Sequence, residues 1–443
     1  MNRLVKKKAA LHNLGCKVNA YETEAMRQML EAAGYEIVDF SEAADVYVIN
    51  TCSVTNVADR KSRQMLHRAK KKNPSAIVVA VGCYVQTKAN EARLDPAVDI
   101  MIGNNRKQGL VEAILAFEKD KSQRESIVEI NHRQPYEKLN LNRNAEHTRA
   151  FVKVQDGCSQ FCSYCIIPYA RGRVRSRELS DVLDEIKALA SNGYQEVVLT
   201  GIHLSSDGTD FGYGQGEGLL RLLGRIHEIE GIRRIRLGSL EPGIITEQFA
   251  TELAGMEKIC PHFHLSLQSG CDSVLKRMNR RYTTAEYAMR CEILRNFFEN
   301  PAITTDVIAG FPGETEAEFL KTRQFLEQMQ FYEMHIFKYS KRQGTRAAAM
   351  DGQIPEAVKA ERSAQLILLG EQMSARYREG FTGKISEALL EEPFSYNGKQ
   401  YVTGYTKEYV KIAAETGNSR VNTFIRGKIT GQLTDEIYLM VEF

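Results

Sequence analysis

The stretch C-S-Q-F-C-S-Y-C (158–165) places three thiols, Cys158, Cys162 and Cys165, on one short segment that follows a predicted strand at 150–155. Three thiolates can each hold one iron of a four-iron cluster. Because no fourth cysteine is nearby, one iron would stay open to an outside ligand. The alternatives are a zinc site, although zinc usually takes four ligands, and three unrelated buried thiols.

Three other cysteines, Cys16, Cys52 and Cys83, lie far apart in the sequence, but each directly follows a short apolar run. Predicted strands and helices alternate in this region, at 9–14, 22–33, 46–50, 57–72 and 77–81. Such alternation predicts a parallel sheet with right-handed crossovers, whose C-terminal strand ends meet at one edge about 4.8 Å apart. We therefore expect the three thiols to converge on a second cluster site, unless they merely fill gaps in the core.

The alternation of predicted strands and helices resumes from residue 150. An α/β fold is therefore predicted for both the N-terminal and the central region. Six further strands are expected, at 150–155, 196–200, 234–237, 262–267, 302–307 and 333–337. Six strand–helix units predict a parallel barrel or partial barrel with its site at the C-terminal strand ends. A long helix is expected at about 355–378, and the glycine turns and aromatic runs that follow it predict a small antiparallel barrel.

These patterns divide the chain into expected domains at 1–130, 150–374 and 375–443, with the polar stretch 131–149 as a linker. The longest apolar run, 76–85, is too short to cross a membrane, and no signal-peptide segment is recognised. Nine cysteines without export signals favour metal ligation in a reducing cytoplasm over disulfides.

Two three-cysteine sets on different domains resemble the methylthiotransferases of the radical S-adenosylmethionine (SAM) superfamily, over essentially the whole chain. The motifs that carry the resemblance are L-G-C-K-V-N (14–19), N-T-C-S-V-T-N-V-A-D-R-K-S-R-Q (50–64), V-G-C-Y (81–84), D-G-C-S-Q-F-C-S-Y-C-I-I-P-Y-A-R-G-R-V-R-S-R (156–177), T-G-I-H-L (200–204), H-L-S-L-Q-S-G (264–270) and D-V-I-A-G-F-P-G-E-T (306–315). The resemblance implies an N-terminal parallel α/β domain, a central radical-SAM partial (β/α)6 barrel and a C-terminal barrel called TRAM.

The resemblance to the methylthiotransferases also implies two [4Fe-4S] clusters with different functions. The cluster of Cys158, Cys162 and Cys165 would deliver an electron that splits SAM into methionine and a 5′-deoxyadenosyl radical. An auxiliary cluster on Cys16, Cys52 and Cys83 would carry the sulfur, which one SAM methylates. A second SAM would yield the radical that takes hydrogen from carbon 2 of an adenine. A reductant protein such as flavodoxin or ferredoxin would supply electrons.

Several residues match family segments near SAM. The resemblance places Tyr164 and Gly310 near the adenine and Thr200 and Gly201 near the methionine amino group. A looser match places two further residues near the ribose or methionine, namely Ser239 and Glu241.

The run His262–Gln268 also points to the cofactor. On a strand, its two histidines, Ser266 and Gln268 face one side and the apolar residues face the other. A polar inner face is expected where a barrel holds a polar cofactor, so we predict that His264 and Gln268 line the site. The alternative is that both histidines are metal ligands.

The family is known to act on three substrates: threonylcarbamoyl-adenosine in tRNA, isopentenyl-adenosine in tRNA, and an aspartate of a ribosomal protein. The segment 50–64 most resembles the threonylcarbamoyl branch. That substrate carries a free carboxylate, which a guanidinium binds well. The alternating arginines after the cluster loop, Arg171, Arg173 and Arg175, are predicted to contact the substrate, and at least one of the first two to bind this carboxylate. The alternative for each is a phosphate contact or a solvated position.

The expected partner is therefore tRNA, not DNA or a membrane. A predicted helix carries seven cations that would track phosphates: Arg60, Lys61, Arg63, Arg68, Lys70, Lys71 and Lys72. A smaller cluster of the same kind is Lys276, Arg277, Arg280 and Arg281. The C-terminal segment offers aromatics for stacking on bases, at Tyr396, Tyr401, Tyr405 and Tyr409. A non-enzymatic RNA-binding protein with structural iron or zinc is the competing hypothesis.

Overall fold

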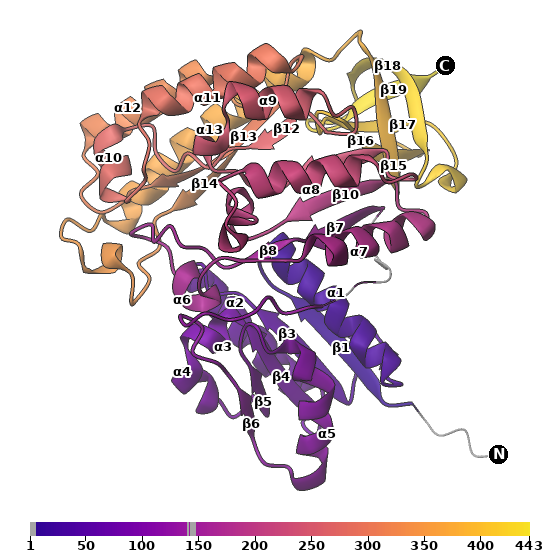
Figure 1. Ribbon diagram of the computed structural model, residues 1–443, viewed down its shortest axis with the longest axis vertical. Coiled ribbons are helices and arrows are strands. Elements are labelled where there is room, and N and C mark those ends of the chain that lie inside the picture. The colour runs from indigo at the N-terminus through magenta and orange to yellow at the C-terminus, as the bar shows by residue number, and fades with distance from the viewer. Residues whose placement is uncertain (1–5, 140, 142–147) are drawn as a thin grey trace.

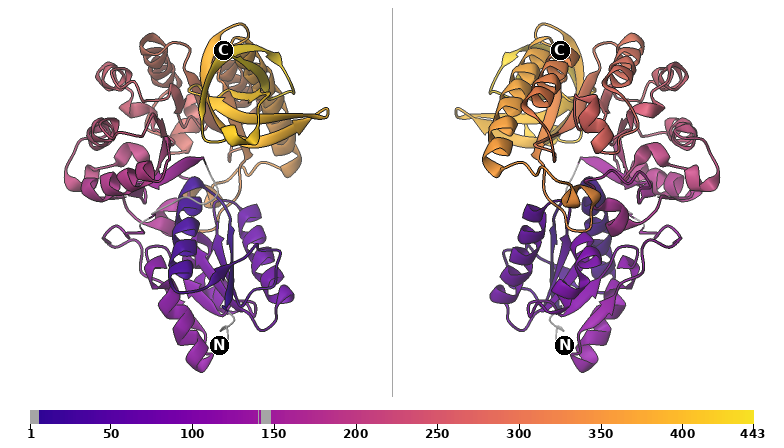
Figure 2. Two further views of the ribbon diagram at one scale, coloured as in Figure 1. Left: turned by 90° about the vertical axis from the view of Figure 1, so that its right-hand side faces the viewer. Right: turned by 90° about the vertical axis from the view of Figure 1, so that its left-hand side faces the viewer.

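The computed structural model describes residues 6–139, 141 and 148–443. Its three parts follow one another along the chain and pack together (Figure 1). The N-terminal part forms one end of the molecule, the central part lies across it, and the C-terminal barrel sits beside the central part, away from the N-terminus (Figures 1 and 2).

The N-terminal part is a parallel sheet in the order β2-β1-β3-β4-β5-β6, with helices on both faces (Figure 2). Its elements are β1 (Lys8–Asn13), α1 (Lys17–Ala32), β2 (Glu36–Ile37), β3 (Val46–Thr51), α2 (Asn56–Lys72), β4 (Ile77–Gly82), α3 (Cys83–Thr87), α4 (Ala89–Arg93), β5 (Ile100–Ile102), α5 (Leu110–Asp120) and β6 (Arg124–Ser126). Every residue of β3 and β4 is buried, because helices cover both faces of the sheet.

The central part is an open barrel of six parallel strands. They are β7 (Arg149–Lys153), β10 (Glu196–Thr200), β11 (Arg234–Leu237), β12 (His262–His264), β13 (Ala302–Ala309) and β14 (Glu333–Lys338). Isolated parallel bridges, Ile235 to Ile259 and Leu240 to Leu265, join its two three-stranded sheets. The fold class that the sequence predicts is therefore confirmed, and each predicted central strand overlaps an observed one.

The barrel's helices lie outside. They are α7 (Leu179–Ser191), α8 (Glu217–His227), α9 (Glu247–Ala254), α11 (Thr284–Phe297), α12 (Glu316–Met329) and α13 (Glu356–Glu379). Alternate strand residues such as Val152, Ile235 and Phe263 pack in the apolar core that includes residues of these helices. Their neighbours along each strand, such as Lys153, Arg236 and His262, are polar and face inward. The interior of the barrel is therefore a polar lumen.

The C-terminal part is a closed barrel in the order β15-β16-β17-β19-β18. Its strands are β15 (Ile385–Tyr396), β16 (Lys399–Thr406), β17 (Lys411–Ala414), β18 (Phe424–Gln432) and β19 (Tyr438–Glu442). Four pairings are antiparallel, as the sequence predicts, but β17 pairs with β19 in parallel and this closes the barrel.

Two further features were not expected from the sequence. The strands β5 and β6 have only three residues each and extend the N-terminal sheet. In the stretch predicted as a linker, Leu139 and Leu141 are buried against Tyr21 and Ala25 of α1; residues 140 and 142–147 of this stretch lie outside the described residues. Within the described ranges, none of the helices has the length and apolar character that a membrane span needs.

Candidate active site

The cluster loop 158–165 is held at both ends by backbone and side-chain hydrogen bonds. The Cys158 N–H donates to the Gly172 carbonyl at 2.9 Å. Ser163 donates its N–H to the Met278 carbonyl at 2.9 Å and its hydroxyl to the Arg277 carbonyl at 2.8 Å. These contacts fix the loop between Gly172, directly after α6 (Ile167–Arg171), and the end of α10 (Asp272–Arg277).

The three thiols of this loop are close enough to influence one another's charge. Burial raises the pKa of Cys158 to about 11 and that of Cys165 to about 12, and the neighbouring Cys162 raises both. The Nη1 of Arg280 lies 3.4 Å from the Cys162 sulfur. Holding three thiolates here requires added positive charge, which this arginine supplies in part and an iron cluster would complete.

Arg280 also joins the cysteines to the predicted SAM residues. Its guanidinium pairs with Glu241 at 2.9 Å and donates to the Ser266 carbonyl at 3.0 Å. Burial opposes ionisation of Glu241, but hydrogen bonding from His203 and the charge of Arg280 lower its pKa overall. Arg280 therefore lies inside the site, so its predicted role in a phosphate-binding surface cluster is wrong.

The other residues predicted to lie near SAM have different environments in the structure. Thr200 is buried at the end of β10, Tyr164 is half-buried within the cluster loop and Ser239 is exposed. A Cβ on Gly201 would lie 2.9 Å from Gln155 Oε1. Gly310 has φ +73°, and a Cβ there would meet Lys359 of α13 at 2.4 Å. Backbone conformation and packing thus already account for Gly310.

His264 lies on the lumen face, as predicted. Its Nδ1 is 3.0 Å from Thr304 Oγ1, and its Nε2 is 3.3 Å from Asp306. The His335 ring stacks at 5.7 Å, and these two histidines with Asp306 offer ligand atoms within 4.8 Å of one another. Thr304 orients the His264 ring through Nδ1, while Nε2 lies near Asp306 without a hydrogen bond among the described residues, and we interpret this group as a polar wall of the site.

Gln268 is buried where the chain leaves the lumen wall, with φ +72°. Its backbone N–H donates to the Asp306 carbonyl at 2.8 Å, and its carbonyl accepts from the Ile308 N–H at 2.9 Å. These bonds hold the residue in a left-handed conformation that a non-glycine side chain rarely adopts. Such strain is often found at ligand sites, which agrees with the predicted role.

The structure also brings the second cysteine set together. Cys16 directly precedes α1, Cys52 directly follows β3, and Cys83 opens α3 directly after β4. A Cβ on Gly15 would lie 2.9 Å from the Cys52 sulfur. Burial raises the pKa of Cys52 to about 11, and both other thiols raise it further. Among the described residues, only His264, Asp306 and His335 have ligand atoms that all lie within 4.8 Å of one another. The sulfur atoms of the two cysteine sets are farther apart than this, so neither set is arranged around a single metal ion.

The loops that carry this set are fixed by buried amides. Asn19 donates to the Leu14 and Thr51 carbonyls at 2.7 and 3.1 Å. Asn104 donates to the Cys83 sulfur at 3.4 Å and to the Ala170 carbonyl of the central part at 2.8 Å. The second site is therefore built at the boundary between the two parts.

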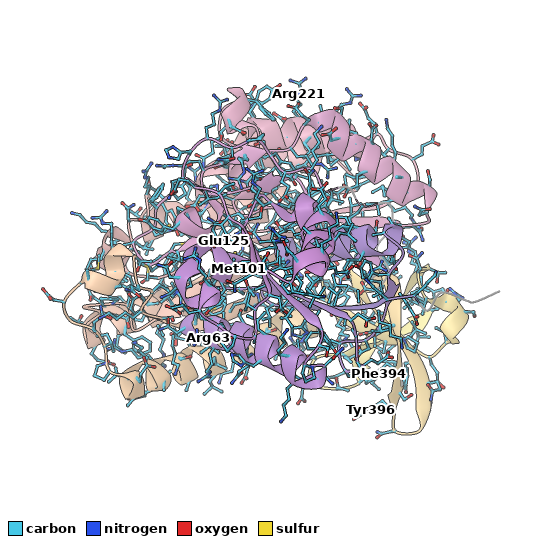
Figure 3. The ribbon with its side chains drawn as sticks, turned by 90° about the horizontal axis from the view of Figure 1, so that it is seen from below. Arg63, Met101, Glu125, Arg221, Phe394 and Tyr396 are labelled. Atoms are coloured by element: carbon cyan, nitrogen blue, oxygen red, sulfur yellow. The ribbon has the colours of Figure 1, made fainter. Side chains whose placement is uncertain are left out.

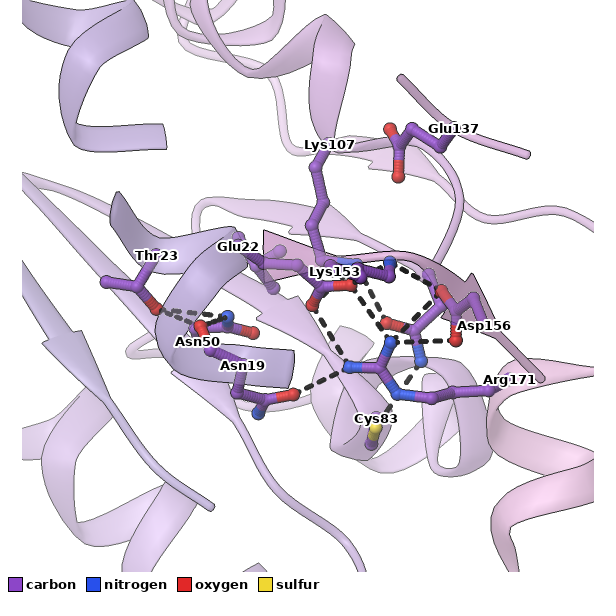
Figure 4. A network of polar contacts seen from close by, with 12 residues as sticks. Asn19, Glu22, Thr23, Asn50, Cys83, Lys107, Glu137, Lys153, Asp156 and Arg171 are labelled. Carbon is purple, nitrogen blue, oxygen red and sulfur yellow. Dashed lines mark hydrogen bonds and ion pairs between the residues drawn. The ribbon is translucent and has the colours of Figure 1, made fainter. Parts of the chain in front are cut away.

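Arg171 lies at the centre of a buried network across this boundary (Figure 4). Its guanidinium pairs with Glu22 of α1 at 2.9 Å and with Asp156 at 3.1 Å, and it donates to Asn19 at 2.6 Å. Lys153 bridges the same two carboxylates at 2.7 Å each. Burial opposes ionisation of Glu22, but Arg171 and the two nearby lysines hold its pKa below the usual range.

The network changes the roles of the predicted arginines. Arg171 is fully buried with its carboxylate partners, and Arg175 donates to the Arg171 carbonyl at 2.8 Å. Neither is available to an outside carboxylate, so the prediction that they contact substrate is wrong. Instead, the charge of Arg171 acts on the thiols Cys16 and Cys52 and lowers their pKa values against the effect of burial. Arg173 is exposed and lies over the Phe161 ring at 4.4 Å.

A second contact between the parts was not expected from the sequence. Arg342, in the loop after β14, reaches the first turn of α2. It pairs with Asp59 at 2.8 Å and donates to Ser53 at 2.8 Å and Asn56 at 2.7 Å. Ser53 is next to Cys52, so the central part holds this cysteine loop as well. No local sequence signal marks a pairing across 283 residues.

The C-terminal barrel inserts the end of its β16–β17 hairpin into the lumen. Tyr409 stacks on His262 at 4.7 Å and on Tyr405 at 4.5 Å, and Arg236 lies over its ring at 4.7 Å. Tyr401 is buried. Three of the four tyrosines predicted to stack on RNA therefore serve packing. Tyr396 stacks beside Phe394 on the projecting β15–β16 hairpin (Figure 3).

Comparisons with known proteins agree with this architecture. Residues 8–103 match the uncharacterized protein family UPF0004, and residues 152–326 match the Radical SAM superfamily. The solved structure of the radical S-adenosylmethionine methyltransferase TsrM from Kitasatospora setae superimposes with a TM-score of 0.54, at 16% identity, over 75% of each chain. Fold and site thus define a radical-SAM protein with an additional N-terminal three-cysteine site.

Relatives that match over more than 90% of both chains identify the family within the radical-SAM proteins. The threonylcarbamoyladenosine tRNA methylthiotransferase MtaB of Bacillus subtilis (strain 168) is 40% identical, over 95% of this chain and 93% of the relative. MtaB of Aquifex aeolicus (strain VF5) is 40% identical, over 91% of this chain and 98% of the relative. The tRNA-2-methylthio-N(6)-dimethylallyladenosine synthase of Clostridium novyi (strain NT) is 35% identical, over 94% and 92%. The chain belongs to the radical-SAM methylthiotransferase family.

Proposed function

We propose that this enzyme adds a methylthio group to carbon 2 of N6-threonylcarbamoyladenosine beside the tRNA anticodon, at position 37. The observation that carries the proposal is the pair of three-thiol sites: the N-terminal one lies at the boundary of the two parts, where Arg171 and Asn104 join it to α6 (Ile167–Arg171), the helix that directly follows the loop of the central set. A sulfur-carrying site and a radical-generating site must act on one substrate atom, so they must lie near a shared space.

The residues present fit two [4Fe-4S] clusters and SAM. Cys158, Cys162 and Cys165 would hold one cluster, which when bound would supply the electron for SAM cleavage. In this site Arg280 offsets the charge of the sulfurs, while Glu241 and the polar lumen wall orient the bound SAM. The second cluster would be held by the thiols of Cys16, Cys52 and Cys83, beside the buried charge of Arg171.

Two observations support threonylcarbamoyladenosine as the substrate: the names of the relatives and the polarity of the lumen. The relatives at 40% identity are named for threonylcarbamoyladenosine, and the dimethylallyladenosine relative stands at 35%. An isopentenyl group would require an apolar pocket, whereas the lumen side chains, among them Arg149, Arg236 and His264, are polar. The threonylcarbamoyl reading is therefore preferred over the isopentenyl and ribosomal-protein alternatives.

Binding of tRNA would use two exposed surfaces. On α2, Lys61, Arg68 and Lys71 are exposed, whereas Lys70 is paired with Asp99 at 2.6 Å; Figure 3 shows Arg63 on the same helix. Phe161 of the cluster loop and Tyr169 of α6 pack edge to face, with Arg173 above the Phe161 ring. Cations along a helix suit phosphates and an aromatic–arginine patch suits unpaired bases.

The proposal also includes an electron donor, a cellular location and the limits of the domains. A reductant protein such as flavodoxin or ferredoxin would deliver electrons in the cytoplasm, where thiols stay reduced. We also keep 1–130, 150–374 and 375–443 as the working domains, because each range holds one of the three sheet systems described above.

The deciding experiment is nucleoside mass spectrometry. Reconstituted enzyme, SAM and a chemical reductant would be incubated without oxygen with tRNA carrying either threonylcarbamoyladenosine or isopentenyladenosine. We expect a methylthio gain on the first substrate. A gain on the second alone would move the enzyme to the other branch, and SAM cleavage without any gain would refute the tRNA assignment.

A further inference from the structure

Three side chains of the types that bind metal ions meet on one wall of the lumen. His264 ends β12, Asp306 lies in the middle of β13 and His335 lies in β14, so each comes from a different one of three neighbouring strands. In the strand register, Asp306 is directly opposite His335, and Thr304, two residues before Asp306, is opposite His264. The sheet therefore presents all three side chains on its lumen face at nearly the same level.

The distances within this group fit the ligands of a single ion. Nε2 of His264 lies 3.3 Å from Oδ2 of Asp306, and the ligand atoms of all three residues lie within 4.8 Å of one another. Two ligand atoms that are each about 2.1 Å from one ion stand about 3.0–3.4 Å apart, so the first pair already has this spacing. His335 is exposed, and a rotation of its side chain to another rotamer would bring its ring closer to the other two ligands.

The ligand atoms are free, and one of the rings is held in place from behind. Nε2 of His264 is buried without a hydrogen bond among the described residues. In the same ranges, neither the carboxylate of Asp306 nor the ring of His335 forms a side-chain hydrogen bond. The other nitrogen of His264, Nδ1, lies 3.0 Å from Thr304 Oγ1. A histidine that binds a metal almost always has its second nitrogen held in this way, so the group has both the ligands and the supporting contact of a metal site.

The donor set indicates the kind of ion. Two imidazole nitrogens and one carboxylate oxygen suit divalent transition metals such as Zn²⁺, Fe²⁺ or Mn²⁺, whereas Mg²⁺ and Ca²⁺ prefer sites made of oxygen alone. Three protein ligands leave at least one coordination position for an outside ligand. Because the three side chains face the lumen, this position would be turned towards whatever the lumen holds.

The charges in the lumen give the ion a use. The arginines that face the lumen are already paired with carboxylates, namely Arg149 with Glu391 at 2.9 Å, Arg234 with Glu387 at 3.3 Å, Arg236 with Glu196 at 2.9 Å, and Arg280 with Glu241 at 2.9 Å. A divalent ion beside the single carboxylate of Asp306 would instead leave a net positive charge on this wall. An anionic group of a substrate would find its counter-charge there.

We propose that His264, Asp306 and His335 bind one divalent transition-metal ion, and that its open position takes the carboxylate of the threonylcarbamoyl group. The metal site stands on the geometry alone, whereas its carboxylate ligand rests on the proposed function. The ion binds by charge and coordination, and it neither gains nor loses an electron in this role. An isopentenyl group offers no ligand atom, so the same contact separates the two tRNA substrates.

The first measurement titrates Mn²⁺ into reconstituted enzyme without SAM or RNA. The enzyme should contain about eight irons per chain, so that clusters occupy the thiols. Free Mn²⁺ gives an EPR signal that is lost on binding, and we expect one ion to bind per chain. Zn²⁺ should displace it, because nitrogen ligands bind Zn²⁺ more tightly. In enzyme labelled with ¹⁵N-histidine, pulsed EPR should detect two imidazole nitrogens on the bound Mn²⁺.

Variants assign the ligands. His335→Ala and Asp306→Ala should each weaken Mn²⁺ binding more than about 100-fold, and His335→Ala should leave one imidazole nitrogen on the ion at saturation. Thr304→Val keeps all three ligands but frees the His264 ring, so it should weaken binding about 10-fold. The matched control is His132→Ala, because His132 is exposed and belongs to none of the barrel strands. It should leave Mn²⁺ binding unchanged.

The second measurement tests the carboxylate ligand. Dissociation constants are compared for two anticodon stem–loop RNAs, one with threonylcarbamoyladenosine and one with the threoninol analogue, in which CH2OH replaces the carboxylate. Excess Mg²⁺ is present throughout to occupy the phosphates. With Mn²⁺ bound, wild type should prefer the carboxylate about 10- to 100-fold, as expected for a contact between charged groups. Without Mn²⁺, or in His335→Ala, the preference should disappear.

Each contrary result has a definite meaning. Wild type that binds no Mn²⁺, or binds it without imidazole nitrogens, overturns the metal site. Binding that all three variants leave unchanged places the ion elsewhere and also overturns it. A carboxylate preference that is equal with and without Mn²⁺ refutes the carboxylate ligand and leaves the proposed function intact. No methylthio gain on threonylcarbamoyladenosine in wild type with Mn²⁺ bound refutes the proposed function, and the carboxylate ligand with it, but not the metal site.

Discussion

The central cysteine set and the N-terminal set reach the same arrangement by different routes. Cys158 and its two partners share one loop, so eight consecutive residues nearly define the site. The N-terminal thiols come from the ends of three strands and approach one another only because β1, β3 and β4 are neighbours. The first site is local and the second is a property of the assembled sheet.

The two sites also differ in the cation beside them. The central thiols have Arg280, which comes from the same part of the chain. The N-terminal thiols have Arg171, which comes from the central part and is bound to Glu22 across 149 residues. We conclude that the local site is self-contained, whereas the sheet-built site depends on another domain for its charge balance.

The largest expected effect separates the two sites by their chemistry. Cys162→Ala and Cys52→Ala should each reduce iron from about eight to about four atoms per chain. Only Cys162→Ala should abolish SAM cleavage, while Cys52→Ala should keep cleavage and lose methylthio transfer. Iron analysis and product mass spectrometry measure this, with Cys291→Ala, a buried cysteine of the apolar core, as the control. Loss of SAM cleavage in Cys52→Ala would mean that the sites are not independent.

The next effect tests whether the N-terminal site depends on the central part. Arg171→Met should lower the free energy of unfolding by about 3–5 kcal/mol, because it leaves Glu22 and Asp156 buried with fewer cations. Urea unfolding of the metal-free chain measures this. The exposed Arg173→Met serves as the control, with a change within about 0.5 kcal/mol. Equal losses in the two variants would contradict the role of Arg171.

Substitution of Arg342 also tests whether the N-terminal thiol site depends on the central part, with a smaller expected loss of stability. Arg342→Ala removes charged hydrogen bonds to Asp59, Ser53 and Asn56, and should cost about 2–3 kcal/mol. Hydrogen exchange should quicken at the start of α2 and around Cys52, but not in the loop 158–165. Arg346→Ala, an exposed residue nearby, should change neither. Faster exchange in the central loop would show that the two sites are coupled.

The smallest effect concerns the anchor of the central loop. Arg277 and Ser273 hydrogen-bond Glu318 and lower its pKa to about 2. A carboxylate with a lowered pKa stabilises the fold above its unfolded value, and this contribution is lost as the pH falls from about 4.5 towards 2. The difference between wild type and Glu318→Gln should be below about 1 kcal/mol at about pH 5 and shrink at about pH 3. A difference that grows with acid would refute the pairing.

Sequence patterns predicted the fold more completely than the site. The strand 234–237 coincides with β11, and convergence of the N-terminal thiols followed from strand–helix alternation alone. The three-residue strands β5 and β6 carry too little pattern to recognise. The misassigned residues were arginines and three C-terminal tyrosines, because the sequence shows a cation or an aromatic ring but not its partner. Neither the pairing of Arg171 with Glu22 nor the position of Arg280 beside Cys162 leaves a local signature.

The bond between Arg171 and Glu22 also sets an order of events during synthesis. A ribosome completes all of the N-terminal sheet before it adds Lys153 and Arg171, so for that interval Lys107 is the one buried cationic partner that the described residues offer to Glu22. The three N-terminal thiols are then without their neighbouring guanidinium and without the Arg342 contact. We expect that, if this site takes the proposed second cluster, the cluster is loaded only after the central domain has been translated, when most of the chain has been made.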